Sequence, residues 1–134
     1  MLKIKISALP AFSVLLVSFW ATSAVAQSSE AIRQSLLDAL MAEQIAIDCP
    51  TIKQNGRMGR GLDKLLFEKA REAKLSDDDY VDEVLKLNAQ EVYDYGTSFI
   101  KKQKIDVDSE ASWCEAGHRL ISTGDPVGRF LLSR

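Results

Sequence analysis

Two cysteines and a single histidine carry the most specific chemistry in this sequence. Cys114 and His118 stand close together near the end of the chain, and Cys49 precedes Pro50 much earlier. In an oxidising compartment an even number of cysteines favours a disulfide. A bond between Cys49 and Cys114 would close a loop of about 65 residues, for which the chain-entropy model gives roughly 4 kcal/mol of stabilisation. We therefore predict a structural disulfide between them.

Other chemistry fits the spacing of these residues less well. Redox-active pairs usually stand as C-x-x-C, and covalent haem attachment needs C-x-x-C-H. A zinc ion could be bound by Cys114 and His118, which share one helix face, together with Cys49 and Asp48. Such a site would compete with the disulfide for both thiols, so we expect no metal and no cofactor.

His118 is also the one place where a titrating base stands near other functional side chains, those of Trp113 and Arg119. Histidine is the commonest general base. No serine or cysteine nucleophile with a recognisable motif accompanies it, because Cys114 is expected in the disulfide. We therefore predict no catalytic residue and expect Trp113, His118 and Arg119 to form an interaction patch. An enzyme with His118 as its base is the least favoured alternative, and it requires His118 to line a cleft with a polar partner.

A glycine-rich run from Asn55 to Gly61 resembles, at first sight, a loop that cradles phosphate. The dinucleotide fingerprint needs a preceding strand and a β-α-β unit, whereas we expect Cys49-Pro50 and a helix before this run. The P-loop needs Gly-Lys-Ser/Thr, which the run does not contain. We interpret it as a flexible or closely packed entry to a helix, with Arg57 and Arg60 as a candidate anion contact.

The first 26 residues have the three parts of a cleavable secretory signal. A positive start, an uncharged apolar stretch and the small-residue motif Ala24-Val-Ala26 follow one another in that order. An uncleaved membrane anchor is the alternative, because the uncharged run approaches the roughly 20 residues that span a bilayer. Polar residues interrupt the run, and Gln27 in place of a cysteine argues against a lipid anchor. We predict a signal peptide over residues 1–26 and a single mature domain over 27–134, in the periplasm or secreted.

The charge balance excludes one large class of partners. The chain has 17 basic and 19 acidic residues, a net charge of −2, and cleavage would remove Lys3 and Lys5. Binding to nucleic acid needs clustered excess positive charge, which is absent. We expect no nucleic acid, and contact with the membrane only through the signal peptide during export.

Helical periodicity runs through most of the predicted mature chain. The first helix should be capped by Ser28 or Ser29 and end before Pro50. Ser76 should cap the third helix, and Asp108 or Ser109 the fourth. The second is clear from Leu62 and could begin near Met58. The expected helices cover about residues 28–47, 62–74, 77–102 and 109–122.

The end of the chain carries a stop signal and a restart signal. Gly124 can end the fourth helix, and Asp125 and Pro126 can begin a short terminal helix or a docking tail. No run alternates as a strand does between hairpin turns. We predict an all-α fold: a small bundle of four main helices plus a short C-terminal helix, stapled by one disulfide.

Four short motifs stand along the predicted mature chain: Ile47-Asp-Cys-Pro-Thr-Ile52, Leu75-Ser-Asp-Asp-Asp-Tyr80, Ser112-Trp-Cys-Glu-Ala-Gly117 and Gly124-Asp-Pro-Val-Gly-Arg-Phe-Leu-Leu132. Together they resemble a known family of small exported alphaproteobacterial proteins, catalogued as domain of unknown function 5333. The resemblance covers about residues 30–134 and implies a helical fold, a Cys49–Cys114 bond and no assigned activity. The glycine-rich stretch at 56–61 departs from the more continuous helix expected in that family.

Because the residues form no catalytic set, we expect a non-enzymatic binding or interaction protein of the cell envelope, whose partner is an envelope protein that the sequence does not identify. A periplasmic stress chaperone and an inhibitor or immunity-type protein are the alternatives.

Overall fold

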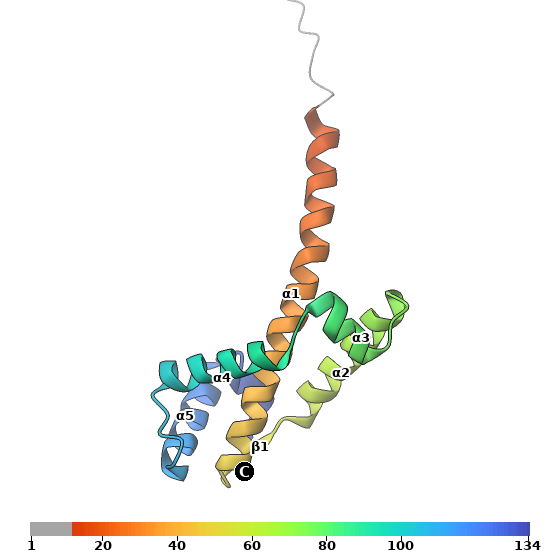
Figure 1. Ribbon diagram of the computed structural model, residues 1–134. Coiled ribbons are helices and arrows are strands. Elements are labelled where there is room, and N and C mark those ends of the chain that lie inside the picture. Colours follow the sequence, from red (N-terminus) through yellow and green to blue (C-terminus); the bar gives the residue numbers. More distant parts are fainter. Residues whose placement is uncertain (1–11) are drawn as a thin grey trace, which may run out of the picture.

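The computed structural model describes residues 12–134, with side chains from Ser29 onward, so the positive end of the predicted signal peptide lies outside it. One long helix, α1, forms the spine of the molecule, and its first part projects away from the other elements (Figure 1). The elements are α1 (Phe12–Asp48), β1 (Ile52–Gln54), α2 (Gly56–Glu72), α3 (Asp77–Asp79), the π-helical turn η1 (Tyr80–Leu85), α4 (Ala89–Gln103), α5 (Glu110–Thr123), the 3-10 turn η2 (Gly128–Phe130) and β2 (Leu131–Ser133).

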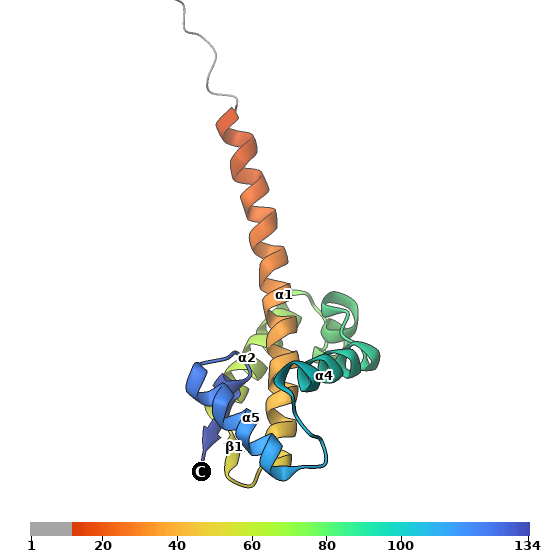
Figure 2. The ribbon, with the colours of Figure 1, turned by 90° about the vertical axis from the view of Figure 1, so that its left-hand side faces the viewer.

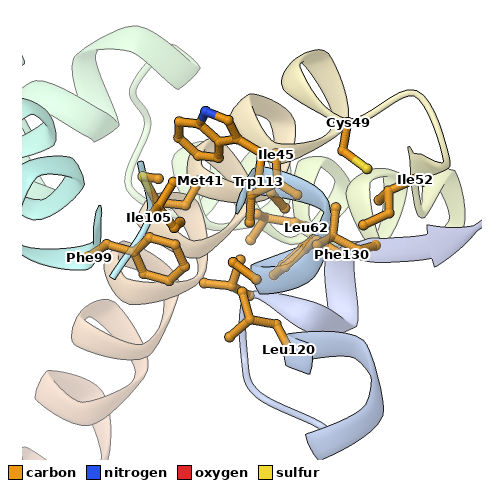
Figure 3. Packing of buried hydrophobic residues seen from close by; sticks show 14 residues of the cluster. Met41, Ile45, Cys49, Ile52, Leu62, Phe99, Ile105, Trp113, Leu120 and Phe130 are labelled. Atoms are coloured by element: carbon orange, nitrogen blue, oxygen red, sulfur yellow. The ribbon is translucent and has the colours of Figure 1, made fainter. Parts of the chain in front are cut away.

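Two apolar clusters lie along α1. The larger surrounds its C-terminal half and takes side chains from β1, α4, α5 and the C-terminal segment, including Ile45, Ile52 and Leu120 (Figure 3). The smaller joins the preceding turns of α1 to α2 and η1, with Ile32 and Tyr80 among its buried members. The fold therefore depends on α1, which contributes to both clusters.

A two-stranded antiparallel sheet closes the chain on itself. β1 pairs with β2 in the register Ile52↔Ser133, which places the C-terminus beside the end of α1 (Figures 1 and 2). Beyond the ladder, Asn55 N–H donates to Phe130 O at 2.7 Å and Arg134 N–H to Thr51 O at 2.9 Å. Strands of three residues are too short to show alternation, so this sheet could not be predicted from the sequence.

The glycine-rich run forms the first turns of α2. Asn55 caps the helix, its side chain accepting from Met58 N–H at 3.4 Å, so α2 starts earlier than the expected Leu62 or Met58. Gly59 and Gly61 have open space where a Cβ would stand. No close approach requires these two glycines. The run is helical, and the short strand β1 precedes it, where the sequence led us to expect only the end of a helix.

The single helix expected over residues 77–102 is interrupted. Ser76 caps α3 as predicted, accepting from Asp79 N–H at 3.1 Å. The chain then widens into η1, turns through a left-handed residue at Lys86 (φ 52°), and restarts at α4 under an Asn88 cap. This path buries both Leu85 and Leu87, which a continuous helix would direct to different faces.

The cap and the stop of α5 are as the sequence predicts, whereas the expected short terminal helix is a three-residue 3-10 turn followed by the strand β2. Ser109 caps α5, accepting from Ser112 N–H at 3.2 Å, and Gly124 ends it with φ 68°. Asp125 accepts from Val127 N–H at 2.9 Å before the short turn η2. α1 ends at Asp48, before Pro50, but it runs through Ser28 and Ser29, so neither serine caps it in the full-length chain.

The all-α class and the stapling disulfide are confirmed, with the small sheet as an addition. Within residues 12–134, none of the helices combines the length and the apolar character needed to cross a membrane.

Candidate functional site

Cys49 and Cys114 form the predicted disulfide, which joins the end of α1 to α5 across a Cα–Cα distance of 5.0 Å. The two sulfurs differ in environment. Cys49 is fully buried in the larger cluster, whereas Cys114 is half-buried. The bond spans 65 residues of sequence, so it restricts the unfolded chain strongly.

His118 lies next to this disulfide and contacts two hydroxyl groups. Its Nε2 is 3.0 Å from Thr51 Oγ1, and its Nδ1 is 3.4 Å from Ser133 Oγ. Thr51 Oγ1 in turn lies 3.2 Å from Cys49 Sγ and 3.8 Å from Cys114 Sγ. Sequence reasoning missed both hydroxyl groups, because only the turn after α1 and the small sheet bring them to α5.

Among the residues that the structure describes, no group of three or more histidine, cysteine, aspartate or glutamate side chains could hold a metal ion. Both cysteines are oxidised, so the thiolates of the zinc alternative are not present. The imidazole of His118 therefore lies at the surface beside the disulfide, in contact with the hydroxyl groups of Thr51 and Ser133.

The expected patch of Trp113, His118 and Arg119 is not brought together. Trp113 is buried, with its indole N–H donating to Val107 O at 3.1 Å. Arg119 leaves α5 in another direction and donates to the backbone oxygen of Gln103 at 3.1 Å. This part of the prediction was wrong, because residues one and five positions apart on a helix face different ways.

Arg119 lines a polar hollow of about 390 Å³ between the end of α4 and α5, together with Lys102, Lys104 and Glu115. Arg57 and Arg60, the candidate anion contact, are exposed on the first turns of α2, where the Arg60 guanidinium lies over Gly56. The two arginines and the polar hollow are thus separate surfaces.

An apolar hollow of about 560 Å³ lies between α1 and α4, with Trp113 of α5 among its lining residues. Large side chains stand exposed around it: Leu40 is 42 % exposed, Ile47 68 % and Tyr93 68 %. Gly96 leaves room on the α4 side, where a Cβ would stand 3.5 Å from Met41 Sδ. Exposed apolar side chains that lie together mark an interaction surface, whereas single exposed apolar side chains are ordinary.

A second hollow of about 310 Å³ lies on the other side of Leu40, between α1 and α2. Glu43 lines both hollows, and Asp63 lines the second; these acids are the charged residues among the two linings. We call Leu40, Ile47, Tyr93 and the two flanking hollows the Leu40 face.

Buried polar contacts fix α1 against α4 beside this face. Asp38 accepts hydrogen bonds from Tyr95 Oη at 2.5 Å and from Gln34 Nε2 at 3.0 Å. Burial of the phenol and its contact with Asp38 raise the pKa of Tyr95 well above its usual range. Further along the same helices, Arg33 pairs with Glu91. These contacts hold the two walls of the larger hollow in register.

The fold and its surfaces define a small helical protein with one disulfide, built around a single long helix. The model of a family of unknown function (DUF5333) matches residues 24–132, so the chain belongs to that family. No curated protein and no solved structure matches the chain.

Proposed function

We propose that this family member is an exported, non-enzymatic binding protein of the cell envelope, and that the Leu40 face docks an apolar, positively charged segment of a partner protein. The observation that carries the proposal is the exposure of Leu40, Ile47 and Tyr93 around one apolar hollow. Exposed aromatic and aliphatic side chains beside a hollow are the usual centre of an interface.

The chemistry of the partner follows from the lining of the face. Apolar residues dominate the larger hollow, so the partner segment contributes apolar side chains that fill it. The charged lining residues, Glu43 and Asp63, are both acidic. Lysine or arginine residues of the partner, placed beside its apolar residues, would complement the charges of Glu43 and Asp63 and select the register of binding.

Two features support export. The N-terminal residues have the order of parts of a secretory signal, ending at Ala24-Val-Ala26. The Cys49–Cys114 disulfide is of the kind that persists in oxidising compartments. Mass spectrometry of envelope material should give a chain that starts at Gln27 with both thiols oxidised; a chain retaining Met1, or two free thiols, would contradict export.

The enzyme alternative gains the polar partners that it required, but His118 does not line any of the three hollows described above. His118 contacts Thr51 and Ser133, yet its side chain is exposed, and the three hollows described above are lined by other residues. General base catalysis needs a substrate held within hydrogen-bonding reach of the imidazole. The Leu40 face offers the better-formed binding surface.

Binding of designed peptides tests the proposal. One amphipathic helical peptide contains only Leu and Lys, and a matched peptide of equal length contains only Leu and Glu. Trp113 lines the hollow, so its fluorescence reports occupancy in the mature chain. We expect the Leu/Lys peptide to bind more tightly, with an affinity that falls as salt is added.

Two variants locate the binding. Leu40→Asp should weaken binding of the Leu/Lys peptide about tenfold or more, because it places a charge at the centre of the contact. Phe67→Asp is the matched control, since Phe67 is 56 % exposed on α2 outside both hollows. Equal effects of the two substitutions, or equal binding of the two peptides, would overturn the proposal. Self-association that Leu40→Asp abolishes would instead assign the face to a second copy.

A further inference from the structure

Thr51 connects a surface imidazole to a buried sulfur. Its hydroxyl oxygen lies 3.0 Å from His118 Nε2 and 3.2 Å from Cys49 Sγ. Cys49 has no exposed surface, whereas Thr51 and His118 are exposed. A continuous path for a proton therefore runs from the protein surface to the inner sulfur of the disulfide.

The backbone fixes this hydroxyl group in place. Ile52 N–H donates to Cys49 O at 3.2 Å, closing the turn that holds Thr51, and Arg134 N–H donates to Thr51 O at 2.9 Å. Ser133 Oγ contacts the other nitrogen of His118 at 3.4 Å, which orients the ring toward Thr51. Three separate segments of the chain thus converge on the disulfide.

We propose that the Cys49–Cys114 bond is a thiol–disulfide exchange site, reduced in the folded protein by a dithiol, with Thr51 and His118 supplying the proton to Cys49. The two sulfurs have the asymmetry that such exchange requires. Cys114 is half-buried and Cys49 is fully buried, so we assign Cys114 as the sulfur that is attacked and Cys49 as the sulfur that leaves. A buried thiolate is unfavourable without a proton or a charge partner, so the relay removes the main obstacle to exchange.

The reaction balances in two steps. A thiolate of the dithiol attacks Cys114 Sγ, the Cys49–Cys114 bond breaks, and its electron pair stays on Cys49 Sγ. The hydroxyl group of Thr51 passes a proton to that sulfur while it takes one from the protonated ring of His118, in a single concerted transfer along the two contacts. The second thiolate of the dithiol then attacks its own partner sulfur and releases Cys114 as a thiolate. The dithiol is oxidised to a disulfide, and this protein is reduced by two electrons.

The fold has contacts that hold the same region when the bond opens. β1 pairs with β2, and Gly117 brings α5 so close to Ile45 and Ile52 that a Cβ there would stand 2.8 and 2.4 Å from their side chains; neither contact includes the disulfide. We therefore expect the reduced protein to remain folded. This inference is independent of docking at the Leu40 face, so either can fail alone.

The rate of reduction by dithiothreitol tests the proposal in the intact oxidised protein. Direct attack on the folded state predicts a rate proportional to the dithiothreitol concentration, whereas reduction through global unfolding predicts a plateau at the unfolding rate. Thr51→Val should slow reduction about tenfold or more, because general acid catalysis contributes factors of roughly that size or larger. Thr51→Ser keeps the hydroxyl group and should restore the rate.

Two further variants separate proton supply from a structural role. His118→Ala should slow reduction, and added imidazole should restore it, since the side chain is exposed. Thr123→Val is the matched control: that hydroxyl group bonds the Arg119 backbone oxygen on the same helix, at 2.9 Å. A plateau with dithiothreitol, equal rates for Thr51→Val and Thr51→Ser, or no imidazole rescue would overturn the proposal.

Discussion

Tyr95 on α4 donates a hydrogen bond from its hydroxyl group to Asp38 Oδ1 on α1, across 2.5 Å. Asp38 is 5 % exposed and is the buried charged residue among those the structure describes. Tyr95→Phe would leave the carboxylate with Gln34 as its side-chain partner. We expect a loss of about 1.5–3 kcal/mol in the free energy of unfolding, because hydrogen bonds to charged groups are of that size. Urea unfolding at neutral pH measures it; an unchanged midpoint would contradict the role assigned to this contact.

The same contact predicts a loss of stability in alkali. Burial first, and then Asp38, raise the pKa of Tyr95 in the folded state above the unfolded value of about 10. The unfolded chain therefore releases this proton first, so the stability contribution is complete below about pH 10 and falls as the pH rises further. Unfolding measured between neutral and strongly alkaline pH should show a steeper decline for the wild type than for Tyr95→Phe. Parallel curves would contradict the shift.

Gly117 and Gly61 should respond in opposite ways to alanine. At Gly117 a Cβ would stand 2.4 Å from Ile52 Cδ1, so Gly117→Ala should cost about 1–3 kcal/mol through overpacking. At Gly61 the corresponding space is open, and alanine within α2 should gain about 0.5–1 kcal/mol. Thermal unfolding of both variants tests the pair. A stabilising Gly117→Ala would show that α5 does not pack as closely as described.

Lysine occupies the left-handed position at the end of α4. Lys104 has φ 55°, a conformation that costs a side chain about 1–2 kcal/mol and glycine almost nothing. Lys104→Gly should therefore raise the free energy of unfolding by about 1 kcal/mol or slightly less. Lys102→Gly, inside the same helix, should lower it by about 1 kcal/mol. Chemical denaturation compares them, and a loss in both variants would contradict the assigned backbone conformation.

Lysines in the left-handed conformation, such as Lys86 and Lys104, lie at helix ends, and the sequence does not predict this conformation for them. The helical class, the disulfide and the caps at Ser76, Ser109 and Gly124 follow from local chemistry, and the structure confirms them. The break at Lys86 does not, because nothing in that residue type favours φ above zero. It forms because burial of Leu85 and Leu87 outweighs the local cost.

The Leu40 face could not be predicted from the sequence for a different reason. Leu40 continues the apolar period of α1, and periodicity alone cannot separate a residue packed in the core from one left exposed for a partner. Only the position of α4, set in part by Tyr95 on Asp38, leaves Leu40 beside an open hollow. Likewise, Thr51 and Ser133 reach His118 only through the small sheet.

The most direct test of the central claim is a nuclear magnetic resonance titration of the isotope-labelled mature chain with the Leu/Lys peptide. Docking on the Leu40 face predicts that the largest amide shifts fall at Leu40, Ile47, Tyr93 and Gly96. In Leu40→Asp the corresponding shifts should need about tenfold or more peptide to reach half of their final size. Shifts that instead cluster around Lys102 and Arg119, or no saturable shifts at all, would contradict the account.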